Sequence, residues 1–283
     1  MHAKVAETCL QCGDQRLALK IHGSEDSTPL LAFHGWRDNA ASFDRLAPLL
    51  AGHRAIAPDF QGHGLSSHLH PSGNYEIWRY MDDIMWLFEG LAVGSPVNIL
   101  GHSMGGAVAC LFAAVFPECV NKLVLLDCFG PLSTAPADAP GQMRRSIEGY
   151  QGLPLMKRRY YSSREKAVQA RARVGLSMEA ADLLANRSLS NDAQGWYWHT
   201  DPRLKLPNRL SLSETHIEQF LRCIACPVLI VSSPQYWEAL KQDPSHRLVW
   251  FRDLRHEKLP GHHHQHLDGQ VEEVAALVRQ FLN

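Results

Sequence analysis

A serine flanked by two glycines, at the junction of a strand-like run and a helix-like run, constrains this chain more than any other feature. Residues 97–100 form a short apolar run typical of a buried strand. Residues 107–116 have the composition of a helix, and Pro117 ends it. Between the two lies the sequence G-x-S-x-G, from Gly101 to Gly105. This order predicts a strand, a tight reversal and a helix.

In such a reversal the central serine hydroxyl stands above the edge of the sheet, because glycines on both sides leave room for the turn. The backbone N–H of the next residue, Met104, then points at the reacting centre. This context makes the pattern a nucleophile elbow, and Ser103 is the predicted nucleophile. A serine hydroxyl reacts only when a base takes its proton, so a histidine and an acid are expected later in the chain. Without them the motif would be only a glycine-rich loop.

Continuous apolar runs alternate with helix-like segments through the first half of the chain. They lie at residues 29–33, 54–58, 97–100 and 122–126, and they resume at 227–232 and 247–251 before a last helix at 271–281. Solid apolar strands between helices predict an α/β fold with a mostly parallel sheet that helices cover on both faces. Active sites of such sheets gather at the carboxyl ends of the strands. Polar residues stand at those ends: His34, Asp59, Ser103 and Asp127.

The alternation stops between residues 129 and 224, where four segments have helical patterns. We therefore predict a core domain formed by residues 1–128 and 225–283, with a helical cap inserted at 129–224. Trp196 and Trp198 of this cap either line an apolar substrate pocket or pack the cap onto the core. A basic stretch at residues 157–173 is interpreted as a solvated helix face, with contact to an anionic substrate group as the alternative.

Composition excludes several classes of partner. The formal net charge is −1, so no overall field attracts nucleic acid, and no apolar stretch is long enough to insert into a membrane. Residues 1–13 lack the apolar segment of a secretion signal, which predicts a cytoplasmic protein.

Two C-x-x-C pairs, Cys9/Cys12 and Cys223/Cys226, leave a four-cysteine zinc site as an alternative. Because about two hundred residues separate the pairs and neither lies in a glycine-rich knuckle, we predict no metal and no cofactor.

Four motifs in order resemble those of the α/β-hydrolase superfamily: His34-Gly35-Trp36, the D-x-x-G-x-G-x-S run at residues 59–66, the elbow, and Gly261 to His266. Within that superfamily, the loops at residues 34–39 and 59–67 are most similar to the serine hydrolase-like proteins. The resemblance covers nearly the whole chain. It implies the α/β-hydrolase fold, with the backbone N–H groups of Trp36 and Met104 as the oxyanion hole. His34 is interpreted as a structural histidine of its loop rather than a second base, and Asp59 as the residue that holds the turn at residues 62–66.

The resemblance implies that the base follows a glycine-containing turn after the last strand. His263 fits, because His266 follows three residues later in an H-x-x-H pattern. His262 and His264 are the rival bases, and a metal-binding histidine tract is the alternative for the whole cluster.

The acid departs from the commonest pattern of the superfamily. Many members carry it after the strand that corresponds to residues 227–232, but the turn here reads Ser233-Pro234-Gln235. Asp127 ends the strand that follows the elbow, where some members have their acid. Glu238 and Asp243 are rivals, and Asp127 as a mere turn residue is the alternative.

These residues predict a serine hydrolase that cleaves a small carboxylic ester or thioester through an acyl-enzyme on Ser103. The expected partner is a small acyl substrate. Two alternatives stay open: carbon–carbon bond hydrolysis by the same Ser103, His263 and Asp127, and a binding protein that retains the fold without catalysis. The sequence leaves the acyl length and the oligomeric state undetermined.

Overall fold

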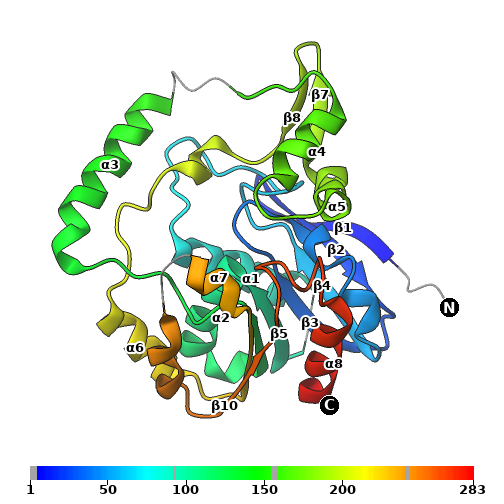
Figure 1. The fold of residues 1–283 in the computed structure, drawn as a ribbon, viewed down its shortest axis with the longest axis vertical. Coiled ribbons are helices and arrows are strands. Elements are labelled where there is room, and N and C mark those ends of the chain that lie inside the picture. The colour runs from blue at the N-terminus through cyan, green and yellow to red at the C-terminus, as the bar shows by residue number, and fades with distance from the viewer. Residues whose placement is uncertain (1–4, 92–93, 154–157, 240–242) are drawn as a thin grey trace.

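The computed structural model describes residues 5–91, 94–153, 158–239 and 243–283. Eight strands of the described chain form one sheet in the order β1-β2-β4-β3-β5-β6-β9-β10 (Figure 1). The strands are β1 (Val5–Cys12), β2 (Gln15–His22), β3 (Thr28–Phe33), β4 (His53–Pro58), β5 (Val97–His102), β6 (Val120–Leu126), β9 (Val228–Ser232) and β10 (Leu254–Lys258). Strand β2 is antiparallel to both β1 and β4, and the other neighbours are parallel. The expected mostly parallel sheet is confirmed.

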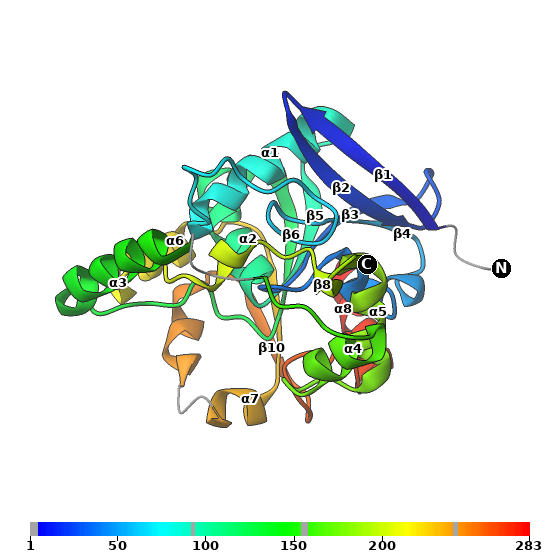
Figure 2. The same cartoon turned by 90° about the horizontal axis from the view of Figure 1, so that it is seen from above.

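Helices pack on both faces of this sheet (Figures 1 and 2). The α-helices of the described chain are α1 (Tyr80–Leu91), α2 (Met104–Val115), α3 (Ala139–Gly152), α4 (Arg164–Ala172), α5 (Met178–Ser188), α6 (Glu214–Cys223), α7 (Pro234–Ala239) and α8 (Val271–Leu282). Helices α1, α2 and α6 contribute to the core on one face, and α8 contributes to the core on the other. No helix in the described ranges combines the length and apolar character that a membrane crossing requires.

Strand β3 shows why the apolar runs are continuous. Leu31 and Phe33 face the core beneath α1 and α2, whereas Leu30 and Ala32 face the core beneath α8. All four side chains are almost completely buried. Because successive strand residues point to opposite faces, a strand covered on both sides needs apolar residues at every position.

One predicted strand is wrong. Residues 247–250 belong to a 3₁₀ helix, Pro244–Trp250, residue 251 caps that helix, and the edge strand β10 follows. The side chain of Asp243 accepts a hydrogen bond from the Ser245 N–H at 2.9 Å, and Pro244 opens the helix. A capping aspartate followed by proline favours a helical turn over an extended strand, which the apolar composition alone did not reveal.

The sheet order separates the two cysteine pairs. Cys9 and Cys12 lie on β1, which is one edge of the sheet, whereas Cys226 lies just before β9, next to the opposite edge. All seven cysteines are free thiols, and those of β1 are exposed. The four-cysteine zinc site is therefore excluded by topology.

The segment between β6 and β9 carries α3 to α6 and a small hairpin of β7 (Leu189–Asp192) and β8 (Gly195–Trp198). Helix α3 extends away from the sheet on one side, and α4, α5 and the hairpin lie together on the other side (Figure 1). Helix α6 differs from the predicted cap: Ile217 and Leu221 are fully buried in the same core cluster as α2. By packing, α6 belongs to the core.

Candidate active site

Ser103 occupies a strained turn between β5 and α2. Its backbone angles are φ 51° and ψ −116°, which a residue with a side chain rarely adopts. Its N–H donates to the Leu126 carbonyl at 3.1 Å, so the turn is tied to the end of the neighbouring strand. A Cβ atom on Gly101 would lie 2.6 Å from Gly106 Cα, and one on Gly105 would collide with the Phe33 carbonyl. The glycines therefore permit the turn that the sequence predicted.

Asp127 and His263 lie in direct contact. Asp127 Oδ2 is 2.6 Å from His263 Nδ1, although 136 residues separate them in the chain. The other carboxylate oxygen, Oδ1, accepts hydrogen bonds from the Ser233 N–H at 2.9 Å and from the Trp237 indole N–H at 3.0 Å. Asp127 also has a left-handed backbone, with φ 49°. Both oxygens are thus fixed, and one is directed at the imidazole.

The donors to Asp127 explain the missing acid after β9. Ser233 stands where the commonest superfamily pattern has a carboxylate, and here its backbone N–H holds the carboxylate supplied by β6. Trp237 completes this support from α7. Sequence analysis did not identify either residue as part of the site. The lack of an acid in this turn was the sequence feature that indicated an acid supplied by another strand.

The rival acids lie in other surroundings. Glu238 is exposed on α7, and Asp243 is exposed and caps the 3₁₀ helix before β10. The rival bases contact other carboxylates. His264 Nε2 is 3.1 Å from Asp38 Oδ2, and His262 Nε2 is 3.6 Å from Asp268.

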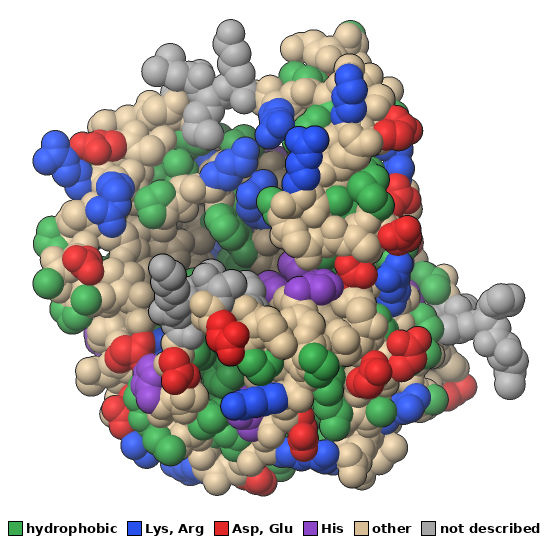
Figure 3. Space-filling view, in the orientation of Figure 1, with side chains coloured by type: hydrophobic (Ala, Val, Ile, Leu, Met, Phe, Trp, Pro, Cys, Tyr) green, Lys and Arg blue, Asp and Glu red, His purple; other side chains and the backbone are tan. Residues whose placement is uncertain are grey.

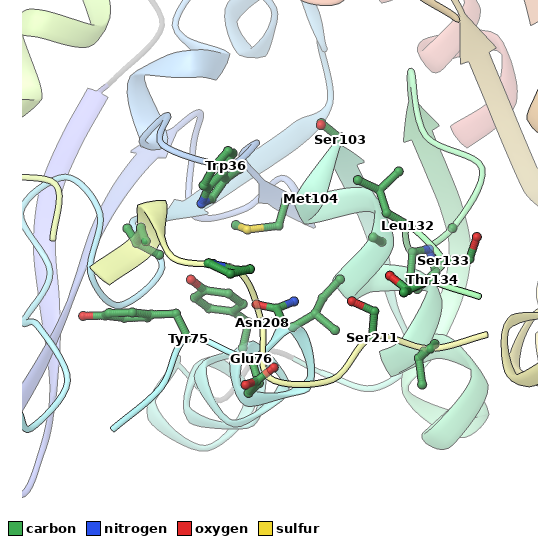
Figure 4. A pocket seen from close by; sticks show the side chains of 18 of the residues that line it. Trp36, Tyr75, Glu76, Ser103, Met104, Leu132, Ser133, Thr134, Asn208 and Ser211 are labelled. Atoms are coloured by element: carbon green, nitrogen blue, oxygen red, sulfur yellow. The ribbon is translucent and has the colours of Figure 1, made fainter. Parts of the chain in front are cut away.

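A cavity of about 640 Å³ opens beside Ser103. Asp127 and His263 also line it, as do Trp36 and Met104, the residues expected to supply the oxyanion hole. Ser103 lies at one end in the close view, and Tyr75 and Glu76 lie at the other (Figure 4). Much of the remaining wall is apolar and comes from several elements: Ile77, Ala107, Leu132, Leu204, Leu206 and Leu212.

Of the two alternatives for Trp196 and Trp198, placement in the substrate pocket is wrong, since neither is among the described residues that line it. Both lie on β8. The Trp196 backbone pairs with Tyr161, and Trp198 packs against the apolar cluster of α4 and α5. Trp198 therefore stabilises the inserted segment, to which the hairpin belongs. Tyr75, Tyr150 and Leu206 line the cavity instead, and their polar sequence neighbours gave no signal.

Comparisons with known proteins agree with this fold. The family described as alpha/beta hydrolase fold matches residues 28–257. A serine hydrolase-like protein of Danio rerio is 30% identical over 281 residues, covering 93% of this chain and 84% of that protein. The chain belongs to the α/β-hydrolase superfamily. The resemblance inferred from the four motifs is confirmed.

Two solved structures show how far the likeness of this α/β hydrolase extends. A hypothetical protein of Pseudomonas aeruginosa PAO1 is 38% identical and has a TM-score of 0.92, with 98% of this chain and 99% of that chain covered. The thioesterase domain from the curacin biosynthetic pathway is 24% identical, with a TM-score of 0.81 over 97% of this chain and 99% of that one. At 24% identity, the likeness to the thioesterase domain shows a shared fold.

In this α/β hydrolase, His102 ties the elbow to the loop of the expected base. Its Nε2 lies 3.0 Å from the His263 carbonyl oxygen, and the two imidazole rings are 4.6 Å apart. Burial, followed by the neighbouring histidines His266 and His263, holds the pKa of His102 well below its ordinary value. His102 is therefore neutral, and the proton resides on Nε2 because a carbonyl oxygen can only accept.

Asp38 joins the same histidines to the inserted segment. Its carboxylate accepts from His264 and pairs with Arg171 of α4. Burial by itself would raise the pKa of Asp38, but His264 and Arg171 outweigh it and hold the pKa well below its usual range. The ligand atoms of Asp38, His102 and His264 lie within 4.8 Å of one another, so these are residues that could hold a metal ion. Because Arg171 offsets the single carboxylate, this cluster offers a divalent cation no net negative charge.

His34 and Asp59 hold loops, as expected. His34 Nδ1 lies 2.8 Å from the Gly35 carbonyl, and Nε2 accepts from the Phe60 N–H at 3.0 Å. Asp59 accepts from the Leu65 N–H at 2.7 Å and from Arg187 Nε at 2.9 Å. The Arg187 contact also joins the core to α5.

Proposed function

We propose that this α/β hydrolase cleaves a small carboxylic ester or thioester through an acyl-enzyme on Ser103. The observation that carries the proposal is the 2.6 Å contact between Asp127 and His263 in the cavity that Ser103 also lines. The order along the chain, serine then acid then histidine, is the order of this superfamily. The coarser assignment to a hydrolase of the α/β fold has the support of the serine hydrolase-like relative.

In the proposed reaction, His263 Nε2 takes the proton of the Ser103 hydroxyl as the oxygen attacks the substrate carbonyl carbon. The new C–O bond pushes an electron pair onto the carbonyl oxygen. When that pair returns, the bond to the alcohol or thiol breaks, and His263 gives its proton to the leaving group. Water then repeats the sequence on the acyl-enzyme, and the carboxylic acid leaves. Asp127 keeps the proton of the imidazole on Nδ1 and stabilises the cation that forms.

The backbone N–H groups of Met104 and Trp36 are proposed to bind the developing oxyanion. Met104 is the first residue of α2, so its N–H is one of those that the helix leaves unpaired. Both residues line the cavity next to Ser103. Removing one donor of such a hole costs roughly 10²–10³-fold in rate in other hydrolases.

The test is labelling of the purified protein with a fluorophosphonate, followed by peptide mass spectrometry, alongside Ser103→Ala. We expect an adduct at Ser103 that the variant lacks, and turnover of p-nitrophenyl esters by the wild type alone. Folded protein that neither labels nor turns over esters between neutral and alkaline pH would overturn the proposal and favour the non-catalytic binding protein.

A further inference from the structure

Three basic side chains interact electrostatically beside the cavity wall, and two of them directly follow or flank residues that line the cavity. They are Arg37, which follows the last residues of β3, Arg159 before α4, and Lys205. In the space-filling view, Lys and Arg side chains gather along one rim of the central hollow (Figure 3). None of the three forms an ion pair with a carboxylate of the described chain. We call these three residues the basic rim.

The basic rim is a place of mutual repulsion. The pKa of Lys205 is lowered by partial burial and then by Arg37 and Arg159. The pKa of Arg37 is lowered by partial burial and then by Arg171, and Tyr161 and Asp38 offset part of this shift. Lys205 is therefore repelled by the two arginines of the basic rim, and an anion placed between the three side chains would relieve that repulsion. By contrast, other arginines of the inserted segment each pair with a carboxylate: Arg164, Arg171, Arg187 and Arg203.

The basic rim adjoins the cavity walls. Arg37 directly follows Trp36, and Lys205 lies between Leu204 and Leu206; all three of these neighbours line the cavity. Arg37 has a left-handed backbone with φ 62°, a costly conformation for a residue with a side chain. The apolar part of the wall suits an acyl chain, which leaves the basic rim for a part of the substrate outside the cavity.

We infer that the basic rim binds phosphate groups on the alcohol or thiol portion of the substrate, so that the preferred substrates are acyl esters or thioesters of a phosphate-bearing carrier. This inference rests on the proposed function. A phosphate carries about −1.5 to −2 charges at neutral pH, which matches several cations better than one carboxylate does, and arginine binds it through two parallel N–H bonds. The chemistry at Ser103 is unchanged: the acyl C–S or C–O bond breaks, and the carrier leaves with the proton from His263.

The test compares two thioesters with the same acyl group and the same bond. Hexanoyl-coenzyme A carries phosphates, and S-hexanoyl-N-acetylcysteamine carries none. Binding is measured by calorimetry on Ser103→Ala, which separates recognition from catalysis, and hydrolysis is measured on the wild type. We expect Kd for the coenzyme A thioester to be at least about ten-fold lower, and this advantage to shrink several-fold between 50 and 500 mM salt as screening increases.

The decisive variant is Arg159→Gln with Lys205→Gln in the Ser103→Ala protein, because neither residue belongs to the catalytic loops. It should reduce the ratio of the two Kd values about ten-fold, and Arg159→Glu with Lys205→Glu should reduce it further. The matched control removes two exposed arginines elsewhere, Arg145→Gln with Arg252→Gln, and should keep the wild-type ratio. Equal affinity for both thioesters, or an unchanged ratio in the rim variants, would overturn the inference. Loss of turnover with a preserved binding ratio would overturn only the proposed hydrolysis.

Discussion

The Asp127 carboxylate reaches His263 from the end of β6, while the turn after β9 donates to its second oxygen. The strand order β5-β6-β9 explains this arrangement. Ser103 ends β5, so the serine and the acid come from adjacent strands. An acid at the end of β6 can therefore contact the histidine in place of an acid after β9. The turn after β9 then contributes a hydrogen-bond donor that holds this carboxylate, and no carboxylate of its own.

Asp127→Asn should lower kcat/KM for a p-nitrophenyl ester by roughly 10³–10⁴-fold, because the amide would favour the wrong imidazole tautomer. Steady-state kinetics on folded protein checks this. Glu238→Gln is the matched control, since Glu238 is an exposed acid on the nearby helix α7 and should retain wild-type activity. Comparable losses in both variants would contradict the assignment of the acid.

The choice among neighbouring histidines is testable in the same assay. His263→Asn should abolish ester turnover and fluorophosphonate labelling, because the hydroxyl of Ser103 loses its base. His262→Asn should keep activity within a few-fold, since that side chain is 42% exposed and contacts Asp268. If His262→Asn is the inactive variant, the base has been assigned to the wrong residue.

Acyl-chain length should depend on the cavity wall and not on the hairpin. Leu206→Trp fills part of the cavity and should shift the preferred p-nitrophenyl ester to a shorter chain, with at least ten-fold lower kcat/KM for the longest substrates. Trp196→Phe should leave the chain-length profile unchanged, because Trp196 belongs to β8 and is not among the described lining residues. If Trp196→Phe shifts the chain-length profile, Trp196 contacts the acyl chain after all.

Acid should destabilise the fold through His63. Burial, and then His34, lowers its pKa from the ordinary 6.5 to about 3. Between these values the unfolded chain binds one more proton than the folded chain. The stabilising contribution is therefore complete above pH 6.5 and is lost as the pH falls, by about 1.4 kcal/mol per pH unit.

Urea unfolding between pH 5 and pH 8 checks this dependence. His63→Gln should lower the difference in bound protons between the unfolded and folded chains by about one. The slope of the unfolding free energy against pH should fall accordingly. His70→Gln, at an exposed position, should leave the slope as it is in the wild type. An unchanged slope in His63→Gln would show that His63 is protonated alike in both states.

The buried ion pair between Asp59 and Arg187 should contribute strongly to stability. Asp59→Asn leaves a buried guanidinium without its central carboxylate, and we expect the free energy of unfolding to fall by about 3 kcal/mol. Urea denaturation measures the change. Arg144→Ala breaks an exposed pair with Glu148 on α3 and should cost no more than about 0.5 kcal/mol. Similar losses in the two variants would refute a special role for burial.

Features that depend on neighbours along the chain can be predicted from the sequence. The elbow follows from glycines beside Ser103, and the parallel sheet follows from continuous apolar runs such as β3, because local sterics and burial dictate both. The position of Asp127 at a strand end was equally readable, since a parallel sheet collects such ends at one edge.

Contacts between side chains that are far apart in the sequence become visible in the folded structure. It brought His263 to Asp127 over 136 residues and directed His264 to Asp38 instead. In the folded structure, α6 also packs into the core, and Trp196 is not among the described residues that line the cavity. These outcomes depend on strand order and on how the inserted segment packs. Neither can be predicted from residues that are neighbours in the sequence. A hydrogen bond of 2.6 Å is a property of the folded geometry, whereas a strand or a tight turn is already favoured by its own few residues.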